Sequence, residues 1–309
     1  MTFSMYDKII LISGPTASGK SKLAIDIAKK FSGEIINADS MQVYKEIKIL
    51  SARPIKLEKI KHHFFGFISA KQNFSTGEWL KLVEKKIREV HDRKKIPIIV
   101  GGTGLYFKAL INGMAKIPAI SKNIRNKTIQ LHKKLGNKLF YEKLIILDPK
   151  CKNTIQPTDP QRMIRAYEVF VHTKKSIQDW KKETKSKFNN KQFIKILLSP
   201  EKIILHEKIE KRSKLMISTK TEREVKQFLQ LKINTLLPAN FIIGIKEFKD
   251  YFANIITKEK LIELIIIRTK QYAKRQFTWQ RGQMSDWNQF FDQDYQKLFK
   301  KVSNLLSKT

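Results

Sequence analysis

The chain has 309 residues, and its 62 lysines and arginines against 28 aspartates and glutamates give a net charge of +34. With 41% hydrophobic residues the composition is globular, and the length is sufficient to bury a core without disulfides or structural metals. The single cysteine, Cys151, excludes an intrachain disulfide framework and a cysteine-rich zinc site. No apolar run reaches the roughly 20 residues that span a bilayer, so we expect a cytoplasmic protein without a membrane span.

The positive charge favours a polyanionic partner, nucleic acid above all. Only 11 of the 62 basic residues are arginine, as an A/T-rich coding sequence would also produce. Exchange of arginine for lysine leaves the charge unchanged, however, and does not explain the shortage of acidic residues. Compositional drift and attraction to a membrane surface remain the alternatives.

Strands and helices are predicted to alternate over the first third of the chain. Apolar runs at 8–13, 34–37 and 96–102 have the length and β-branched content of buried strands. Helical spacing of apolar residues predicts helices over 21–30 and 76–91. The second helix carries its apolar stripe at Trp79, Leu82, Val83, Ile87 and Val90. This order is typical of an α/β fold whose parallel strands are joined by helices.

The composition changes after Gly113. Residues 121–186 are polar and lysine-rich and lack long apolar strands, so we predict a helical insertion domain there. An apolar strand returns at 195–198, and helical patterns follow to the end of the chain. Residues 1–120 and 187–309 would then form one core with C-terminal helices.

The segment between the first strand and the first helix matches G-x-x-x-x-G-K-[ST] in full. Its glycines let backbone N–H groups turn toward phosphate oxygens, and the helix N-terminus adds positive charge. Lys20 would contact the terminal phosphates, and Ser21 would offer its hydroxyl to Mg²⁺. The core is therefore predicted to be a P-loop NTPase-like parallel sheet flanked by helices. The expected phosphate ligands are Gly14, Pro15, Thr16, Ala17, Ser18, Gly19, Lys20 and Ser21.

The acidic residue that kinases and nucleotide triphosphatases place after a later strand is missing after 96–102, which ends in Gly101-Gly102-Thr103. The nearest acid at a strand end is Asp39. Parallel sheets of this kind bind ligands at the carboxyl ends of their strands, so Asp39 should lie near the phosphates. Its role as a metal ligand, a general base or a helix cap stays open on this reasoning alone.

Seven blocks in chain order resemble the tRNA dimethylallyltransferases, also called tRNA isopentenyltransferases, of the bacterial type. They are 14–21, 39–44, 52–54, 62–63, 101–106, 159–169 and 268–281, and together they reach across almost the whole chain. The resemblance implies transfer of a dimethylallyl group from dimethylallyl diphosphate to N6 of the adenosine at tRNA position 37, with Mg²⁺ as cofactor. It also implies that the phosphate loop holds a diphosphate leaving group.

This chemistry assigns roles to a small set of residues. The adenine amine is a weak nucleophile, so catalysis needs a stabilised leaving group and a base for the N6 proton, for which Asp39 is the candidate. Thr16 lies in the loop, and the resemblance implies that Arg212 lies near the diphosphate and that Thr103 acts at the tRNA substrate. The expected catalytic set is Asp39, Thr16, Lys20, Thr103 and Arg212.

The expected tRNA contacts combine the resemblance with charge and residue type. Ser40 and Gln42 lie beside Asp39, and glutamine pairs well with adenine. Basic and aromatic residues interleave over 268–281, which suits an RNA surface or an amphipathic helix with aromatics in the core. Glu168 is interpreted as an arginine partner, and His62-His63 as packing rather than a metal site. The full set is Asp39, Ser40, Met41, Gln42, Thr103, Arg125, Gln161, Arg162, Met163, Ile164, Arg165, Arg275 and Arg281.

Three other functions remain as alternatives: a small-molecule kinase using ATP, an RNA-binding protein with a vestigial loop, and regulatory nucleotide binding. The missing acid after 96–102 and the basic surplus disfavour the first. The expected partners are dimethylallyl diphosphate and a tRNA anticodon stem-loop, which must present its adenosine flipped out of the stack. We expect no membrane association and a monomeric enzyme.

Overall fold

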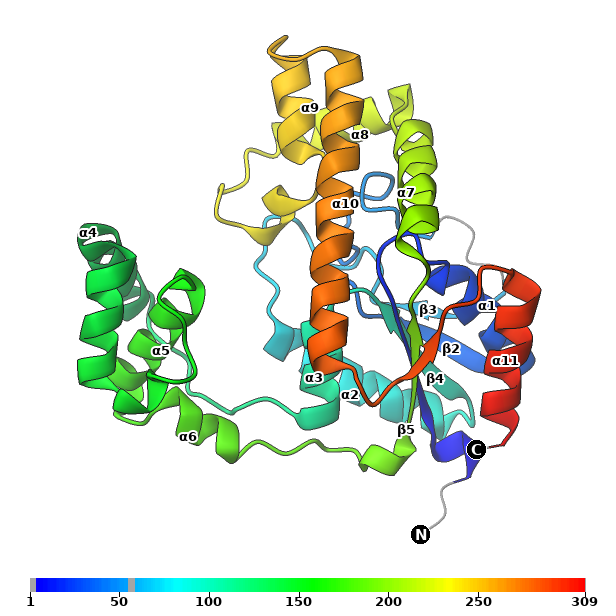
Figure 1. The fold of residues 1–309 in the computed structure, drawn as a ribbon, viewed down its shortest axis with the longest axis horizontal. Helices are drawn as coiled ribbons and strands as arrows, with labels where there is room; N and C mark the ends of the chain where they lie inside the picture. Colours follow the sequence, from blue (N-terminus) through cyan, green and yellow to red (C-terminus); the bar gives the residue numbers. More distant parts are fainter. Residues whose placement is uncertain (1–3, 55–58, 309) are drawn as a thin grey trace. The chain divides into compact units, whose positions relative to one another are not determined.

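The computed structural model describes residues 4–54 and 59–308, and a parallel sheet runs through its larger part (Figure 1). The strands are β1 (Ile9–Ser13), β2 (Gly33–Asn37), β3 (His62–His63), β4 (Ile96–Gly101), β5 (Phe193–Leu198) and β6 (Asn288–Phe290). In the described residues they form one sheet with the order β3-β2-β4-β1-β5-β6, and every neighbouring pair is parallel. The predicted α/β class is confirmed.

The phosphate-loop strand β1 lies inside the sheet. Ile12 aligns with Val100 of β4 on one side and with Ile196 of β5 on the other. All residues of β1, β4 and β5 are buried, as expected of parallel strands covered on both faces. Their continuous apolar runs, rather than alternating ones, therefore made these strands predictable from the sequence.

The chain divides into two compact units, Met1–Ile111 with Phe188–Thr309, and Asn112–Lys187. The predicted insertion 121–186 lies within the second unit. The helices of the sheet-containing unit are α1 (Lys20–Lys30), α2 (Thr76–Asp92), α3 (Gly104–Asn112), α7 (Lys202–Met216), α8 (Thr219–Gln230), α9 (Ile245–Phe252), α10 (Lys258–Gln283) and α11 (Tyr295–Ser307). Short 3₁₀ helices occur at η1 (Met5–Asp7), η3 (Asn190–Gln192) and η4 (Pro238–Phe241).

Helices cover both faces of the sheet (Figure 1). Leu23 and Ile27 of α1 pack with Val302 of α11 in a core on one face. Val83 of α2 and Phe107 of α3 pack in the core on the other face. Burial of apolar side chains on both sides is the main stabilising term of this layered arrangement.

A third core holds the segment that follows β2. Val43 and Tyr44 pack with Val225 of α8, Phe248 of α9 and Ile265 of α10. Helices from the C-terminal third of the chain therefore fix the backbone around Asp39, more than 150 residues earlier in the sequence.

The second unit is helical. It contains α4 (Lys122–Leu147), η2 (Pro149–Cys151), α5 (Pro160–Thr173) and α6 (Ile177–Lys182). Within α4, Gly136 has φ 70° and interrupts the helical backbone with a kink, a conformation that glycine adopts without steric cost. Phe140 and Met163 are fully buried in the core between α4 and α5.

Candidate active site

The phosphate loop joins β1 to α1 and presents the N-terminus of that helix. Gly19 precedes the helix with φ 89°, in the left-handed region that favours glycine. The Leu23 N–H donates to Gly19 O at 3.2 Å, so the helical N–H groups before it have no partner within the helix. These donors and the helix dipole make the loop suited to an anion.

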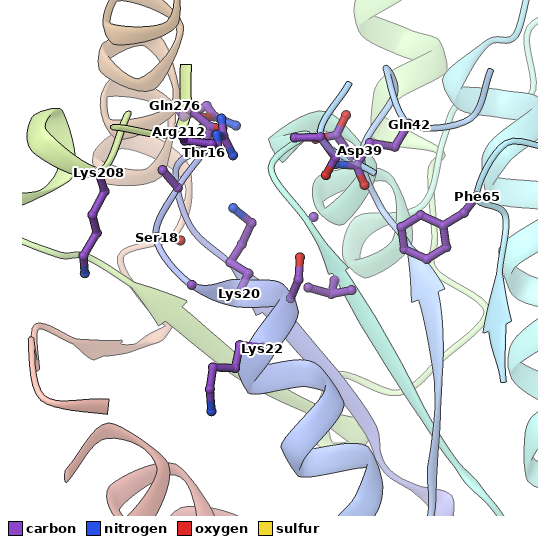
Figure 2. Close-up of a pocket in the computed structure, with 16 residues that line it drawn as sticks. Thr16, Ser18, Lys20, Lys22, Asp39, Gln42, Phe65, Lys208, Arg212 and Gln276 are labelled. Atoms are coloured by element: carbon purple, nitrogen blue, oxygen red, sulfur yellow. Dashed lines mark hydrogen bonds between the residues drawn. The ribbon is translucent and has the colours of Figure 1, made fainter. Parts of the chain in front are cut away.

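The loop lines a cavity of about 360 Å³ (Figure 2). Of the residues predicted to act there, the structure brings together all of 16–21 with Asp39, Gln42 and Arg212. Lys22, Lys208 and Gln276 also line it and were missed by sequence reasoning. The full lining is Thr16, Ala17, Ser18, Gly19, Lys20, Ser21, Lys22, Asp39, Gln42, Ala52, Phe65, Val100, Gly101, Lys208, Arg212 and Gln276.

Lys20 supplies the cation at the centre of the loop. Its Nζ donates to Pro15 O at 2.6 Å. Burial lowers the pKa of Lys20 to about 8, and the positive charge of Arg212 acts in the same direction, whereas Asp39 opposes the shift. An arriving phosphate would strengthen the protonated form of this amine, because an anion nearby favours the charged state of a lysine.

Asp39 faces Lys20 from the segment after β2 (Figure 2). Burial raises the pKa of the Asp39 carboxyl, although the Met41 N–H and the charge of Lys20 act against this. The Met41 N–H donates to Asp39 Oδ1 at 2.9 Å, and the side chain of Asn37 bonds both the N–H and the C=O of Asp39. The Met41 N–H and the Asn37 side chain thus hold Asp39 in place beside the phosphate loop.

Thr103 supports this segment from the turn after β4. Its N–H donates to Ala38 O at 3.2 Å, and its Oγ1 accepts from the Ser40 N–H at 3.0 Å. The Thr103 hydroxyl also donates to Ser40 Oγ at 3.3 Å. The structure therefore places Thr103 beside Asp39 through Ser40, and Thr103 is not among the residues that line the cavity.

Arg212 reaches the loop from α7. Its Nη2 donates to Thr16 Oγ1 at 2.6 Å. Its Nε is buried and has no hydrogen-bond partner among the described residues, and Ser18 Oγ shares this property. Burial lowers the pKa of Arg212, which remains positively charged. Two buried donors without partners in one cavity indicate a site built for an anionic ligand.

Gln42 uses its amide differently from the base-reading role predicted for it. Its Nε2 donates to Ser51 O at 3.1 Å and to Ala52 O at 3.3 Å. Glu224 of α8 in turn accepts from the N–H groups of Lys48, Ile49 and Leu50. In this structure Gln42 therefore holds the loop after it, and its contact with a base remains a prediction.

Gln276 is the cavity residue that sequence reasoning should have found. It lies within the block 268–281, but only the basic and aromatic residues of that block suggested a function. The available signal is spacing, because Gln276 continues the stripe of Ile265, Thr269 and Ala273 at helical intervals. The structure buries Gln276 to 6% exposure, and a buried amide requires hydrogen-bond partners.

The residues present fit Mg²⁺ bound together with a phosphate. Among the described residues there is no group of three or more His, Cys, Asp or Glu side chains that would hold a metal on its own. The Ser21 hydroxyl and the Asp39 carboxylate line the same cavity as the loop, and Mg²⁺ is usually held by few protein oxygens, substrate phosphates and water. His63 instead pairs with Glu34, with Nε2 and Oε2 2.7 Å apart.

The predicted tRNA contacts of the second unit lie mainly on α5. Gln161 and Arg162 are exposed, and Arg165 Nη1 donates to the buried Glu168 Oε1 at 2.6 Å. Arg125 of α4 lies 3.8 Å from the same oxygen. Glu168 therefore is an arginine partner, as interpreted. Met163 is fully buried in the core, so its side chain supports the helix from inside.

The other predicted RNA contacts lie on α10. Arg275 and Arg281 are exposed. The aromatic residues of this segment are partly buried, with Phe277 and Trp279 packed against two different cores. Both interpretations of the segment thus have structural support, since the helix exposes its arginines and buries part of its aromatic surface.

Sequence comparisons find relatives over most of this chain. The family model described as IPP transferase matches residues 42–283. A tRNA dimethylallyltransferase from Pelagibacter ubique is 54% identical over 282 residues, which cover 91% of this chain and 90% of that protein. Another from Rickettsia conorii is 42% identical over 92% of this chain and 79% of that protein.

Solved structures of tRNA-modifying prenyltransferases also match this chain. The full-length tRNA isopentenylpyrophosphate transferase from Bacillus halodurans matches with a TM-score of 0.71 and 30% identity, over 98% of this chain and 96% of that one. A eukaryotic dimethylallyltransferase acting on tRNA matches with a TM-score of 0.83 and 28% identity, over 97% of this chain and 80% of that one. Throughout residues 4–54 and 59–308, every helix is too short or too polar to cross a membrane. By sequence and by structure, the chain belongs to the IPP transferase family.

Proposed function

We propose that this enzyme transfers a dimethylallyl group from dimethylallyl diphosphate to N6 of the adenosine at tRNA position 37. The observation that carries the proposal is that Lys20 and Asp39, both within the ranges that the structure describes, line one cavity without forming an ion pair. The turn after β4 contains no acidic residue. A leaving diphosphate needs cations and N–H donors on one side, and the attacking amine needs a base on the other. The cavity supplies both.

The leaving group would be stabilised by the phosphate loop. Lys20, the first residues of α1 and Arg212 all line the same cavity, and the buried Nε of Arg212 has no partner among the described residues. Loss of one such preorganised donor typically costs about 3 to 4 kcal/mol of transition-state stabilisation. When bound, Mg²⁺ held at Ser21 would neutralise further charge on the diphosphate.

Asp39 would act as the base. The lone pair of the adenine amine is delocalised into the ring, so the amine becomes acidic only as its bond to the allylic carbon forms. A carboxylate whose pKa is raised by burial accepts that proton more readily than an exposed aspartate would. The carbon–oxygen bond to the diphosphate breaks as the carbon–nitrogen bond forms, and the N6 proton passes to Asp39.

The positive surface would bring the RNA to this site. We propose that four exposed residues contact the anticodon stem-loop, namely Gln161 and Arg162 on α5 and Arg275 and Arg281 on α10. We also propose that the enzyme acts as a monomer on tRNA in the cytoplasm.

The test is incubation of the purified chain with Mg²⁺, labelled dimethylallyl diphosphate and unmodified tRNA, followed by nucleoside analysis. We expect N6-dimethylallyladenosine from position 37 and release of one diphosphate per transfer. ATP in place of the prenyl diphosphate should give no product. Turnover of ATP without prenyl transfer would instead identify a P-loop kinase, and RNA binding without any chemistry would identify a binding protein.

A further inference from the structure

The side chain of Gln276 lies between the phosphate loop and the turn that follows β4. Its Oε1 accepts from the Thr16 N–H at 2.8 Å, and its Nε2 donates to Gly102 O at 2.9 Å. One buried amide from α10 thereby joins two segments that are more than 80 residues apart in the sequence. In Figure 2, Gln276 lies beside Thr16 and Arg212 at the loop.

At one end of this amide, Thr16 belongs to the diphosphate site. Arg212 binds the Thr16 hydroxyl at 2.6 Å, while Gln276 binds the Thr16 N–H. Both polar groups that orient Thr16 are therefore fixed by residues from the C-terminal third of the chain. These two contacts fix Thr16 within the loop that lines the cavity.

At the other end, Gly102 leads directly into the adenosine side of the cavity. The next residue, Thr103, bonds to Ala38 O and to the Ser40 N–H. These are the residues immediately before and after Asp39. A displacement of the turn at Gly102 would therefore move the backbone that carries the proposed base.

The contact at Gly102 leaves no room for another side chain. A Cβ atom added at Gly102 would lie 2.2 Å from Gln276 Nε2. The amide also matches the groups that it meets, because one end must accept a hydrogen bond and the other must donate one. Leucine has a similar size but would leave the Thr16 N–H and the Gly102 carbonyl without partners, which is costly for buried groups.

We propose that Gln276 is a positioning residue that couples the diphosphate site to the adenosine site. The inference rests on the function proposed above. RNA that orders the turn at Gly102 also orders Thr16 through this amide, so the loop should bind diphosphate more tightly when the RNA is in place. By thermodynamic linkage, diphosphate should tighten RNA binding by the same factor, for which about fivefold or more is typical of coupled sites.

The test measures the dissociation constant of inorganic diphosphate with Mg²⁺ by calorimetry, with and without a saturating anticodon stem-loop RNA. We expect the RNA to lower this constant about fivefold or more in the natural chain. In Gln276→Leu the two constants should become equal. The matched control is Gln280→Leu, an equally conservative change one helical turn further along α10 at a residue that is also buried, and it should keep the full ratio.

A second variant tests the inference even if Gln276→Leu does not fold. Gly102→Ala leaves the glutamine in the sequence but forces its Nε2 away from the turn, so it should lose the coupling as well. A ratio of one in the natural chain, or an unchanged ratio in Gly102→Ala or in folded Gln276→Leu, would overturn the inference while prenyl transfer by the natural chain still supported the proposed function. Absence of prenyladenosine from the natural chain would contradict the proposed function itself.

Discussion

Lys20 and Asp39 face each other across the cavity, yet in the described part of the chain no ion pair joins them. Lys20 Nζ is bonded to Pro15 O at 2.6 Å, and Asp39 Oδ1 accepts from the Met41 N–H at 2.9 Å. Each group therefore has its own anchor and leaves the space between them to a ligand. The predictions that follow rest on this separation of the proposed leaving-group cation, Lys20, from the proposed base, Asp39.

Replacement of the base should remove chemistry and leave binding. We expect Asp39→Asn to lower the rate of prenyl transfer about 10²- to 10⁴-fold, because general-base help is lost while the shape of the side chain is kept. Single-turnover kinetics and an RNA binding assay measure the two effects separately. Asp294→Asn is the control, because asparagine caps α11 as well as aspartate does. Equal transfer rates in Asp39→Asn and the natural chain would show that Asp39 is not the base.

The pH dependence of diphosphate binding should follow the protonation of the Lys20 amine. The pKa of Lys20 is lowered to about 8 by burial, so the amine is positive below this pH and becomes neutral as the pH rises through it. Since only the positive form attracts diphosphate, affinity should be full near pH 7 and decline above pH 8. Calorimetry between pH 6.5 and about pH 9.5 measures this.

The matched variant for this profile is Lys20→Arg, whose guanidinium stays charged over the whole range. It should bind diphosphate with an affinity that no longer falls above pH 8. If its profile declines in the same way as that of the natural chain, another group is responsible for the pH dependence.

Loss of a buried arginine should reduce kcat/KM more than loss of an exposed lysine on the same helix. Arg212 and Lys208 are four residues apart on α7 and both line the cavity, but only Arg212 is fixed by a hydrogen bond to Thr16. We expect Arg212→Ala to lower kcat/KM for dimethylallyl diphosphate about 10²- to 10³-fold. Lys208→Ala should change it less than about fivefold, as is typical of solvent-exposed charges. A larger effect from Lys208 than from Arg212 would contradict the proposed diphosphate position.

Alanine substitutions at two arginines of α5 should have similar effects on RNA binding but different effects on stability. Arg165 binds the buried Glu168 at 2.6 Å, whereas Arg162 pairs with the more exposed Asp159 at 3.2 Å. If both contact RNA phosphates, each change to alanine should reduce the salt slope of RNA binding by about 1. Only Arg165→Ala should also lower the free energy of unfolding, by about 1 to 3 kcal/mol, because it removes the closest partner of a buried carboxylate.

Urea denaturation and RNA titrations at several salt concentrations measure the two quantities. Arg162→Ala serves as the control for stability. Equal losses of stability in the two variants would mean that Glu168 does not depend on Arg165, and unchanged salt slopes would mean that α5 does not contact the RNA.

Some surface details of the fold were not predictable from periodicity. The spacing of apolar residues placed Leu82 on the buried stripe of α2, but the structure exposes 36% of it and buries Leu80 instead. Each residue turns a helix by about 100°, so Leu80 and Leu82 lie about 200° apart and flank the stripe of Trp79, Val83, Ile87 and Val90 on opposite sides. The packing partners that cover one flank and leave the other to solvent come from elsewhere in the chain, so the stripe alone does not show how far it extends to either side.

The sequence by itself determined the strand, loop and helix around Lys20, because glycine spacing, apolar runs and helix capping act over a few residues. The same local reasoning placed Asp39 at a strand end and left open what surrounds it. Only the tertiary structure decided that Gln276 and Arg212 hold the loop, and that Thr103 holds the residues on either side of Asp39. These contacts join segments that are distant along the chain, and they form because buried amides and guanidinium groups must find hydrogen-bond partners once the sheet and α10 pack together.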